Sequence, residues 1–180
     1  MKKKKHSLNY LLTPDYVFDT YQDVTPEFLA SIGIRALLID IDNTLAPYEQ
    51  DLPDENIIAW FKSMAEADVA CTLISNNHAD RVELFNSILG LPAYHDSGKP
   101  GTKYFIEGMK QMNRTPDETA GLGDQLLTDT LAVHRLGMIS ILVPPINDKK
   151  NLFFRFKRWL EKPFMRRYRR LHKNESEVNK

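Results

Sequence analysis

Carboxylates follow two of the apolar segments in this sequence. Asp40 and Asp42 stand at the end of segment 35–40, and Asp124 follows a second such segment, with Asp129 five residues further on. Two carboxylates that converge on a pocket can serve as a nucleophile and as a general acid or base. Several carboxylates at one place repel one another unless a cation lies between them. The alternatives are a self-capped turn for the first pair and helix N-terminal acids for the second.

A hydroxyl, an amide and a lysine follow two further segments. Ser75 and Asn76 end the apolar segment 69–74 and lead into an expected helix, where a hydroxyl and free backbone N–H groups can bind an anion. Lys99 precedes Pro100 in a glycine-flanked loop and could neutralise a phosphoryl group as a point charge. An ordinary helix N-cap and a solvated loop lysine are the alternatives.

Short β-branched runs alternate with helical patterns through the middle of the chain. This alternation, with nearly continuous apolar strands, predicts a parallel sheet covered by helices on both faces. Such sheets bind ligands beyond the carboxyl ends of their strands, so we expect the residues above at one edge of the sheet. The expected strands are 35–40, 69–74, 93–95, 118–122 and 138–143, and the expected helices are 54–67, 79–89, 102–112 and 126–136.

Length, composition and cysteine content narrow the class of protein. The chain has 180 residues, of which 42% are hydrophobic and 27% charged, as in a soluble globular domain. The longest nearly apolar run, 138–146, is far too short to span a bilayer. No apolar segment follows the N-terminal lysines, so a cleaved secretory signal is not expected. The single cysteine, Cys71, excludes an intramolecular disulfide and fits a reducing, cytosolic setting.

The net charge of zero hides an uneven distribution. Lys2–Lys5 carry +4, residues 6–148 carry −13 and residues 149–173 carry +10. A basic end indicates an anionic partner, either a membrane or a nucleic acid, or serves only as a solubilising tail. We therefore divide the chain into a basic N-terminal extension at 1–24, a globular domain at 25–148 and a basic amphipathic tail at 149–180.

The basic tail has an aromatic face. Apolar side chains recur at helical spacing on both sides of Pro163, which is expected to interrupt the helix, and lysines and arginines decorate the rest. Such a helix suits the surface of an anionic membrane. Its apolar face could instead pack on the acidic body, and arginine with aromatic side chains also suits RNA.

Together these motifs resemble the haloacid dehalogenase (HAD) superfamily of phosphotransferases, which implies a Rossmann-like three-layer α/β/α domain. The sequence is most similar to the YqeG-type subfamily IIIA phosphatases, which are similar to phosphatidylglycerophosphate phosphatases, and the similarity covers roughly residues 8–162. The matching motifs are Asp40-Ile-Asp42-Asn-Thr44, Ile74-Ser-Asn-Asn77, Arg81-Val82, Lys99-Pro100, Gly123-Asp-Gln-Leu126 with Thr128-Asp129, and Val143-Pro-Pro-Ile146.

The resemblance implies a catalytic role for each matching residue. Asp40 would be the nucleophile that forms an aspartyl-phosphate, and Asp42 would act as general acid and then as general base. Ser75 and Asn76, with the neighbouring amides, would bind the phosphoryl oxygens. Lys99 would bind the phosphate as well and offset the negative charge on it and on the nucleophile.

The resemblance also implies Mg²⁺ as the cofactor. Asp40, Asp124 and the backbone carbonyl of Asp42 would be its protein ligands. Asp129 would orient a metal-bound water or Lys99, and Thr44 would support the site from outside the set of ligands.

HAD enzymes often carry a cap domain, but this sequence has no room for one. Only residues 45–53 separate the first motif from its helix, and the gap between Ser75 and Lys99 holds one helix and a short strand. An open pocket suits a substrate too large to enclose, such as a lipid headgroup, a protein or a polynucleotide.

The resemblance implies a Mg²⁺-dependent phosphomonoester hydrolase with phosphatidylglycerophosphate as the leading substrate. One alternative keeps the enzyme but takes a soluble phosphate ester or a nucleotide as its substrate. Another is a non-catalytic module that binds RNA or a membrane. We expect a cytoplasmic protein, with residues 149–173 available for peripheral contact at the inner face of the membrane.

Overall fold

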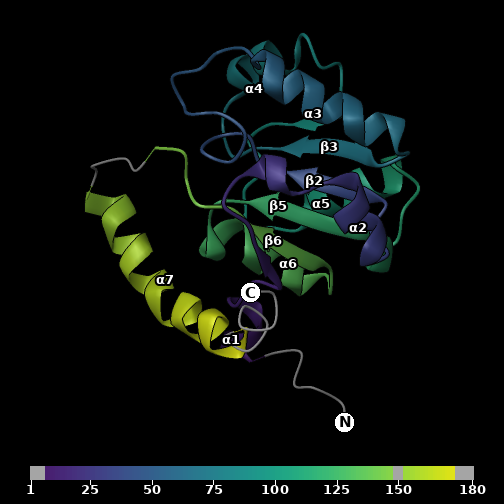
Figure 1. Cartoon of the computed structure of the whole chain (residues 1–180). Coiled ribbons are helices and arrows are strands. Elements are labelled where there is room, and N and C mark those ends of the chain that lie inside the picture. The colour runs from purple at the N-terminus through teal and green to yellow at the C-terminus, as the bar shows by residue number, and fades with distance from the viewer. Residues whose placement is uncertain (1–6, 148–151, 173–180) are drawn as a thin grey trace.

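Six parallel strands form a single sheet in the order β1-β6-β5-β2-β3-β4 (Figure 1). The computed structural model describes residues 7–147 and 152–172, with side chains from residue 159 onward in the second range. Strand β2 lies between β3 and β5, so the carboxyl ends of these three strands are neighbours. The strands are β1 Tyr16–Val17, β2 Ala36–Ile39, β3 Ala70–Ile74, β4 Ala93–Tyr94, β5 Thr119–Gly123 and β6 Ile139–Leu142.

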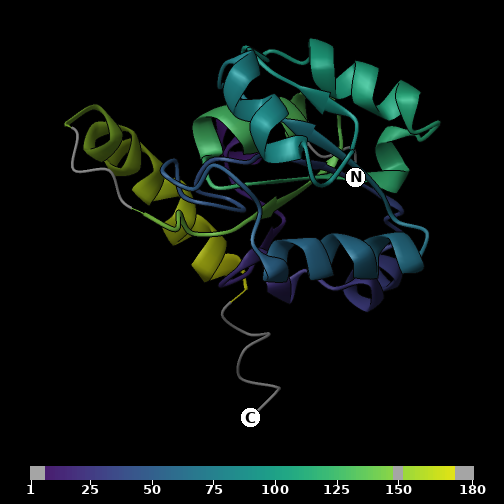
Figure 2. The ribbon, with the colours of Figure 1, turned by 90° about the horizontal axis from the view of Figure 1, so that it is seen from above.

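Helices cover both faces of this sheet, which confirms the expected α/β/α layers. Two separate groups of buried side chains lie on the two faces, one beneath α2, α3 and α4 and the other beneath α5 and α6. Seen from above, α2 and α3 lie together on one side of the sheet (Figure 2). The helices are α1 Leu8–Leu11, α2 Pro26–Ser31, α3 Glu55–Glu66, α4 Ala79–Asn86, α5 Lys103–Gln111, α6 Leu131–Arg135 and α7 Leu152–Leu171, with 3₁₀ turns at Tyr21–Asp23 and Pro116–Glu118 and a π-helix at Leu126–Thr130.

The N-terminal segment differs from the extension expected at residues 1–24. Its described part packs on the domain, because β1 pairs with the edge strand β6. The Asp15 carboxylate accepts hydrogen bonds from the backbone of Ser140 and from His134, both at 2.9 Å, and Val24 is fully buried. A two-residue strand and a four-residue helix are too short to give a periodic pattern, so the sequence did not reveal them. The lysines at 2–5 lie outside the described residues.

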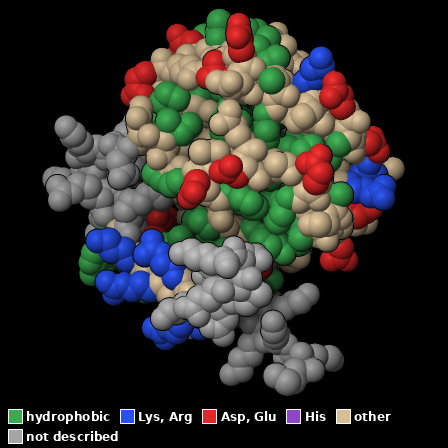
Figure 3. Space-filling model, in the orientation of Figure 1, with side chains coloured by type: hydrophobic (Ala, Val, Ile, Leu, Met, Phe, Trp, Pro, Cys, Tyr) green, Lys and Arg blue, Asp and Glu red, His purple; other side chains and the backbone are tan. Residues whose placement is uncertain are grey.

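The described part of the basic tail is one helix, α7, and it runs through Pro163 without the expected interruption. Glu161 is buried and accepts a hydrogen bond from the backbone N–H of Leu126 at 2.9 Å. The Tyr168 hydroxyl accepts one from the backbone N–H of Val17 at 3.1 Å. These contacts fix the second half of α7 on the body. Its lysines and arginines from residue 159 onward gather on one part of the surface, while the charged side chains on the rest of the face shown are mostly Asp and Glu (Figure 3).

In residues 7–147 and 152–172, no helix has both the length and the apolar character needed to cross a bilayer. Helix α7 is long enough to cross a bilayer, but its many basic residues make it too polar to do so.

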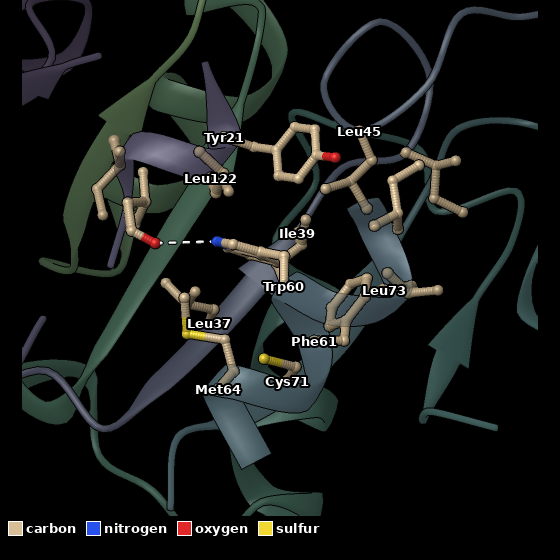
Figure 4. Close-up of a cluster of buried hydrophobic side chains, with 14 of the residues drawn as sticks. Tyr21, Leu37, Ile39, Leu45, Trp60, Phe61, Met64, Cys71, Leu73 and Leu122 are labelled. Carbon is tan, nitrogen blue, oxygen red and sulfur yellow. Dashed lines mark hydrogen bonds between the residues drawn. The ribbon is translucent and has the colours of Figure 1, made fainter. Parts of the chain in front are cut away.

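The larger core shows how the sequence produces helix α3. Its N-cap, Asp54, accepts a hydrogen bond from the backbone of Ile57 at 2.9 Å. Trp60 and Met64 then follow Ile57 on the buried face at helical spacing. The Trp60 indole donates a hydrogen bond to the backbone carbonyl of Val24 at 3.0 Å and so ties α3 to the N-terminal segment (Figure 4).

Cys71 lies in this core beneath α3, and we expect its thiol to be unreactive in the folded protein. Burial raises the pKa of the Cys71 thiol from 9.0 to about 12. The reactive thiolate at pH 8 should therefore be scarcer by roughly 10³-fold than in the unfolded chain. Labelling with a chromogenic disulfide at pH 8 should be slow in buffer and rapid in denaturant, and rapid labelling of the folded protein would contradict the burial.

Candidate active site

The polar residues predicted from the sequence come together at the carboxyl ends of the central strands. Asp40 follows β2, Ser75 follows β3 and Asp124 follows β5, so the order of the strands makes them neighbours. A pocket of about 260 Å³ opens at this edge of the sheet. It is lined by Asp40, Asp42, Tyr48, Ser75, Asn76, Asn77, Lys99, Gln125, Thr128 and Asp129.

The Lys99 ammonium group is buried beside the carboxylates at the base of this pocket. Its Nζ donates to Asp40 Oδ1 at 2.6 Å, to Asp129 Oδ1 at 2.7 Å and to the Ile74 carbonyl at 2.9 Å. These three acceptors match the three donors of an ammonium group. Burial alone would lower the pKa of Lys99, but Asp129 and Asp40 outweigh it and raise that pKa above its ordinary value. Lys99 is therefore a fixed positive charge.

The loop that carries Lys99 is held by the side chain of Asn76. Asn76 Oδ1 accepts from the Lys99 backbone N–H at 2.7 Å and from the Ser97 hydroxyl at 2.9 Å. Its Nδ2 donates to the Lys99 carbonyl at 3.3 Å, and the Lys99–Pro100 peptide bond is cis. The Asn76 side chain thus positions Lys99, and its contact with a phosphoryl group stays a prediction.

Three buried carboxylates form a candidate metal site next to Lys99. One oxygen each from Asp40, Asp124 and Asp129 lies within 4.8 Å of the other two. Burial raises the pKa of Asp40 well above its usual value, Asp129 and Asp124 add to the rise, and Lys99 offsets part of it. One lysine does not balance three carboxylates, and the oxygen donors suit a hard divalent cation. Asp129 was expected to orient a metal-bound water or Lys99 without binding the metal itself. Its carboxylate is nevertheless close enough to contact a cation bound by the other two.

A glycine allows this close approach. A Cβ atom at Gly123 would lie 2.5 Å from the Cβ and Cγ atoms of Asp129, well inside van der Waals contact. The π-helix that follows, Leu126–Thr130, brings Asp129 back over the end of β5, where its Oδ2 accepts from the Gln125 backbone and the Thr128 hydroxyl. Glycine at the end of β5 is therefore required by the site.

The Asp42 carboxylate lies across the pocket, held by residues that follow β3. Its Oδ2 accepts from Asn77 Nδ2 at 3.1 Å and from the Ser75 hydroxyl at 3.4 Å. Its Oδ1 is 3.3 Å from Nη2 of Arg81 in a nearly buried ion pair. Asp40 and Asp42 therefore differ in their surroundings, because one faces Lys99 and the other faces Arg81. Such a difference allows two carboxylates to take different roles.

The loop after β2 adds Thr44, which contacts Asp40, and Tyr48, which lines the pocket. The Thr44 hydroxyl donates to Asp40 Oδ2 at 3.4 Å, and its supporting role in the site stays a prediction. Burial raises the pKa of Tyr48 to about 12, and the charges of Asp42, Asp40 and Asp124 contribute. Its phenol is therefore a neutral donor near the carboxylates. Asn43, which lies directly before Thr44 in the sequence, has a φ of 64°, which asparagine tolerates better than most residues.

The sequence suggested no role for five residues of this site, which are Asn77, Arg81, Tyr48, Gln125 and Thr128. Arg81 had a detectable signal, because a basic side chain in the first turn of a helix opposes the helix dipole and needs another reason to be there. Asn77 precedes the N-cap of that helix, His78, so no helical spacing marks it in the sequence. Tyr48 stands in an irregular loop without periodicity, and no signal in the sequence marks it.

Comparison with known proteins agrees with this geometry. The model of the family described as "Mitochondrial PGP phosphatase" matches residues 5–146, a span that contains every residue of the pocket. A Bacillus subtilis (strain 168) protein named "Probable phosphatase YqeG" is 33% identical over 155 residues, which cover 86% of this chain and 90% of that protein.

Two solved structures share the fold at low sequence identity. A 3-deoxy-D-manno-octulosonate 8-phosphate phosphatase from Yersinia pestis is 18% identical, with a TM-score of 0.50 over 69% of this chain and 72% of its own. An uncharacterised protein from Listeria monocytogenes serotype 4b is 14% identical, with a TM-score of 0.51 over 66% of this chain and 85% of its own. The fold and the family match together confirm the resemblance drawn from the motifs: the chain belongs to the mitochondrial PGP phosphatase family and is a YqeG-type phosphatase of the HAD superfamily.

Proposed function

We propose that this phosphatase hydrolyses phosphate monoesters with Mg²⁺ and through an aspartyl-phosphate on Asp40, and that phosphatidylglycerophosphate is its leading substrate. The observation that carries the proposal is the position of Lys99 between Asp40 and Asp129, beside Asp124. Lys99 fixes the orientation of the Asp40 carboxylate at the base of an open pocket. The three carboxylates together carry more negative charge than Lys99 balances, and a cation can bind to this excess.

The first step transfers the phosphoryl group to the enzyme. The Asp40 carboxylate attacks phosphorus, the bond from phosphorus to the ester oxygen breaks, and a protonated Asp42 gives its proton to the leaving oxygen. Lys99 neutralises charge on Asp40 and the phosphoryl group, and the Ser75 hydroxyl donates to a phosphoryl oxygen. Asn77 and Arg81 orient the Asp42 carboxylate through the contacts described above.

The second step releases inorganic phosphate. Asp42, now ionised, takes a proton from a water molecule that attacks the phosphorus of the aspartyl-phosphate, and the bond to Asp40 breaks. Asp40 is then free for another cycle and Asp42 is again protonated. Both steps ask the protein mainly for positioning and for neutralisation of charge, which the residues of this pocket can supply.

Asp40 and Asp124, with the backbone carbonyl of Asp42, would hold Mg²⁺, and the Asp129 carboxylate lies close enough to contribute. Bound there, the ion supplies positive charge for the carboxylates and for the substrate phosphate.

Two features support a lipid as the substrate. Between β2 and β5 the chain forms only α3, β3, α4, β4, α5 and one 3₁₀ turn, so no cap domain covers the pocket and a membrane-bound headgroup could reach it. Helix α7 adds exposed basic side chains next to the acidic body. Peripheral contact of residues 149–173 with an anionic membrane from the cytoplasmic side is part of this proposal, although 149–151 and 173 lie outside the described residues.

Phosphate release from phosphatidylglycerophosphate in anionic vesicles tests the proposal directly. We expect release in the presence of Mg²⁺ and loss of release when a chelator removes the ion. Hydrolysis of a small soluble ester without hydrolysis of the lipid would reject the lipid and keep the phosphatase chemistry. Nucleotides would then be the next substrates to measure.

A further inference from the structure

A second cavity, which we call the α7 groove, lies between helix α7 and the edge of the sheet that carries the active site. Its volume is about 630 Å³, within the range of roughly 300–1,000 Å³ that is usual for small-molecule sites. Residues after the carboxyl ends of β1, β5 and β6 form one wall, and α7 forms the other. The groove is lined by Val17, Phe18, Asp19, Asp124, Leu126, Leu142, Val143, Pro144, Pro145, Glu161, Lys162, Met165, Arg166 and Arg169.

The α7 groove adjoins the active-site pocket. Gln125 lines the pocket, and its neighbours in sequence, Asp124 and Leu126, line the groove. Asp124 also supplies one oxygen to the cluster of three carboxylates. A ligand in the groove would therefore lie next to the proposed site of phosphoryl transfer.

Three cations from α7 line this groove. Lys162, Arg166 and Arg169 are all exposed, and their spacing along the helix places them on one side. In the part of the chain that the structure describes, none of the three forms an ion pair. Of the acids in the groove, Glu161 accepts from the Leu126 backbone and Asp124 belongs to the carboxylate cluster, which leaves Asp19 as the exposed one. Among the exposed side chains at the mouth, three cations face one acid, so the mouth attracts an anion, whereas the charges of Glu161 and Asp124 lie buried deeper in the groove.

The wall opposite these cations is largely apolar. Leu126 and Leu142 are buried there and pack with Met165 of α7, and Val17 belongs to the same cluster. Pro144 and Pro145 extend the apolar lining beyond β6. A groove with cations on one side and apolar side chains on the other fits a ligand that combines an anionic group with a hydrocarbon part.

We propose that the α7 groove binds the phosphodiester and adjoining glycerol region of an anionic diacyl phospholipid, with Lys162, Arg166 and Arg169 on the phosphodiester and the apolar wall against the start of the acyl chains. This inference rests on the proposed function, because it places the terminal phosphate of the same lipid beside Asp124 and the pocket. The groove would select lipid esters over small phosphate monoesters.

A matched pair of double variants tests the site with a lipid that has no phosphomonoester. The probe is dihexanoylphosphatidylglycerol, titrated as a monomer below its micelle concentration and followed by calorimetry. We expect Arg166→Gln with Arg169→Gln to weaken binding about tenfold or more, because two charge-assisted contacts are lost. Arg167→Gln with Arg170→Gln removes the same charge from the same helix outside the groove and should leave binding unchanged. Thermal melting of all three proteins checks the fold.

Three results would overturn the groove site. The first is an equal loss of lipid affinity in both double variants, which would indicate diffuse electrostatic attraction. The second is that the unaltered protein does not bind the lipid. The third is that a single-stranded RNA displaces the lipid and proves to be the tighter ligand. Glycerophosphoglycerol, which lacks acyl chains, should bind more weakly than the lipid if the apolar wall takes part. Normal lipid binding without hydrolysis of phosphatidylglycerophosphate would reject the proposed substrate and support the groove site. Hydrolysis of phosphatidylglycerophosphate without lipid binding in the groove would support the substrate and reject the groove site.

Discussion

Replacing Asp40 by asparagine is expected to lower the rate of phosphate release by about three orders of magnitude or more, because the attacking carboxylate is lost. The substitution keeps the size of the side chain. Burial and the neighbouring Asp129 and Asp124 carboxylates raise the pKa of Asp40. An ionised Asp40 therefore lowers the stability of the metal-free protein, and a neutral asparagine at this position does not. The fold should therefore survive the change, with Lys99 still bound to Asp129 and to the Ile74 carbonyl.

Both a small phosphate ester and phosphatidylglycerophosphate should be assayed with the Asp40→Asn variant. Asp68→Asn is a matched control, because Asp68 precedes β3 at the opposite edge of the sheet and its side chain is 93% exposed. Its φ of 57° suits asparagine as well as aspartate. The control should keep full activity. If Asp40→Asn retained activity within tenfold of the unaltered protein, Asp40 would not be the nucleophile.

The central strands and most of the candidate site could be predicted because each depends on a local signal. Segment 35–40 contains the apolar run ALLI, and segment 118–122 ends in the small and apolar run AGL. They form β2 and β5, and both strands are buried along their whole length. A parallel sheet brings its carboxyl ends together, so placing Asp40, Ser75 and Asp124 at one edge needed only the strands and their direction.

Other parts of the structure depend on contacts between distant residues and left no signal in the sequence. Strand β1 has two residues and is defined only by its pairing with β6. The position of α7 depends on the hydrogen bond between Glu161 and the Leu126 backbone, so neither the groove nor the continuous helix through Pro163 could be foreseen. The ion pair between Arg81 and Asp42 also joins separate elements, the first turn of α4 and the loop after β2, so the partner of Arg81 could not be predicted.

Replacing Lys99 by methionine is expected to cost both activity and stability. The activity should fall about 10²- to 10³-fold, because the charge that faces the nucleophile and the phosphoryl group is lost. Removing one partner of a buried ion pair costs about 3–5 kcal/mol of stability, since the carboxylates of Asp40 and Asp129 remain. Lys62→Met is the matched control, because Lys62 is exposed and its ion pair with Glu66 spans 3.9 Å.

The instability of the Lys99→Met variant should depend on pH and on metal. Burial already raises the pKa of Asp40, and without Lys99 that pKa rises further. The folded variant then holds a proton that the unfolded chain releases near pH 4, so its stability falls as the pH rises from there to the raised folded pKa. Melting should show a larger loss at pH 8 than at pH 5, and Mg²⁺ should restore part of it at pH 8 by replacing the missing positive charge. A variant that melts like the unaltered protein at pH 8 without metal would mean that Lys99 does not balance the carboxylates.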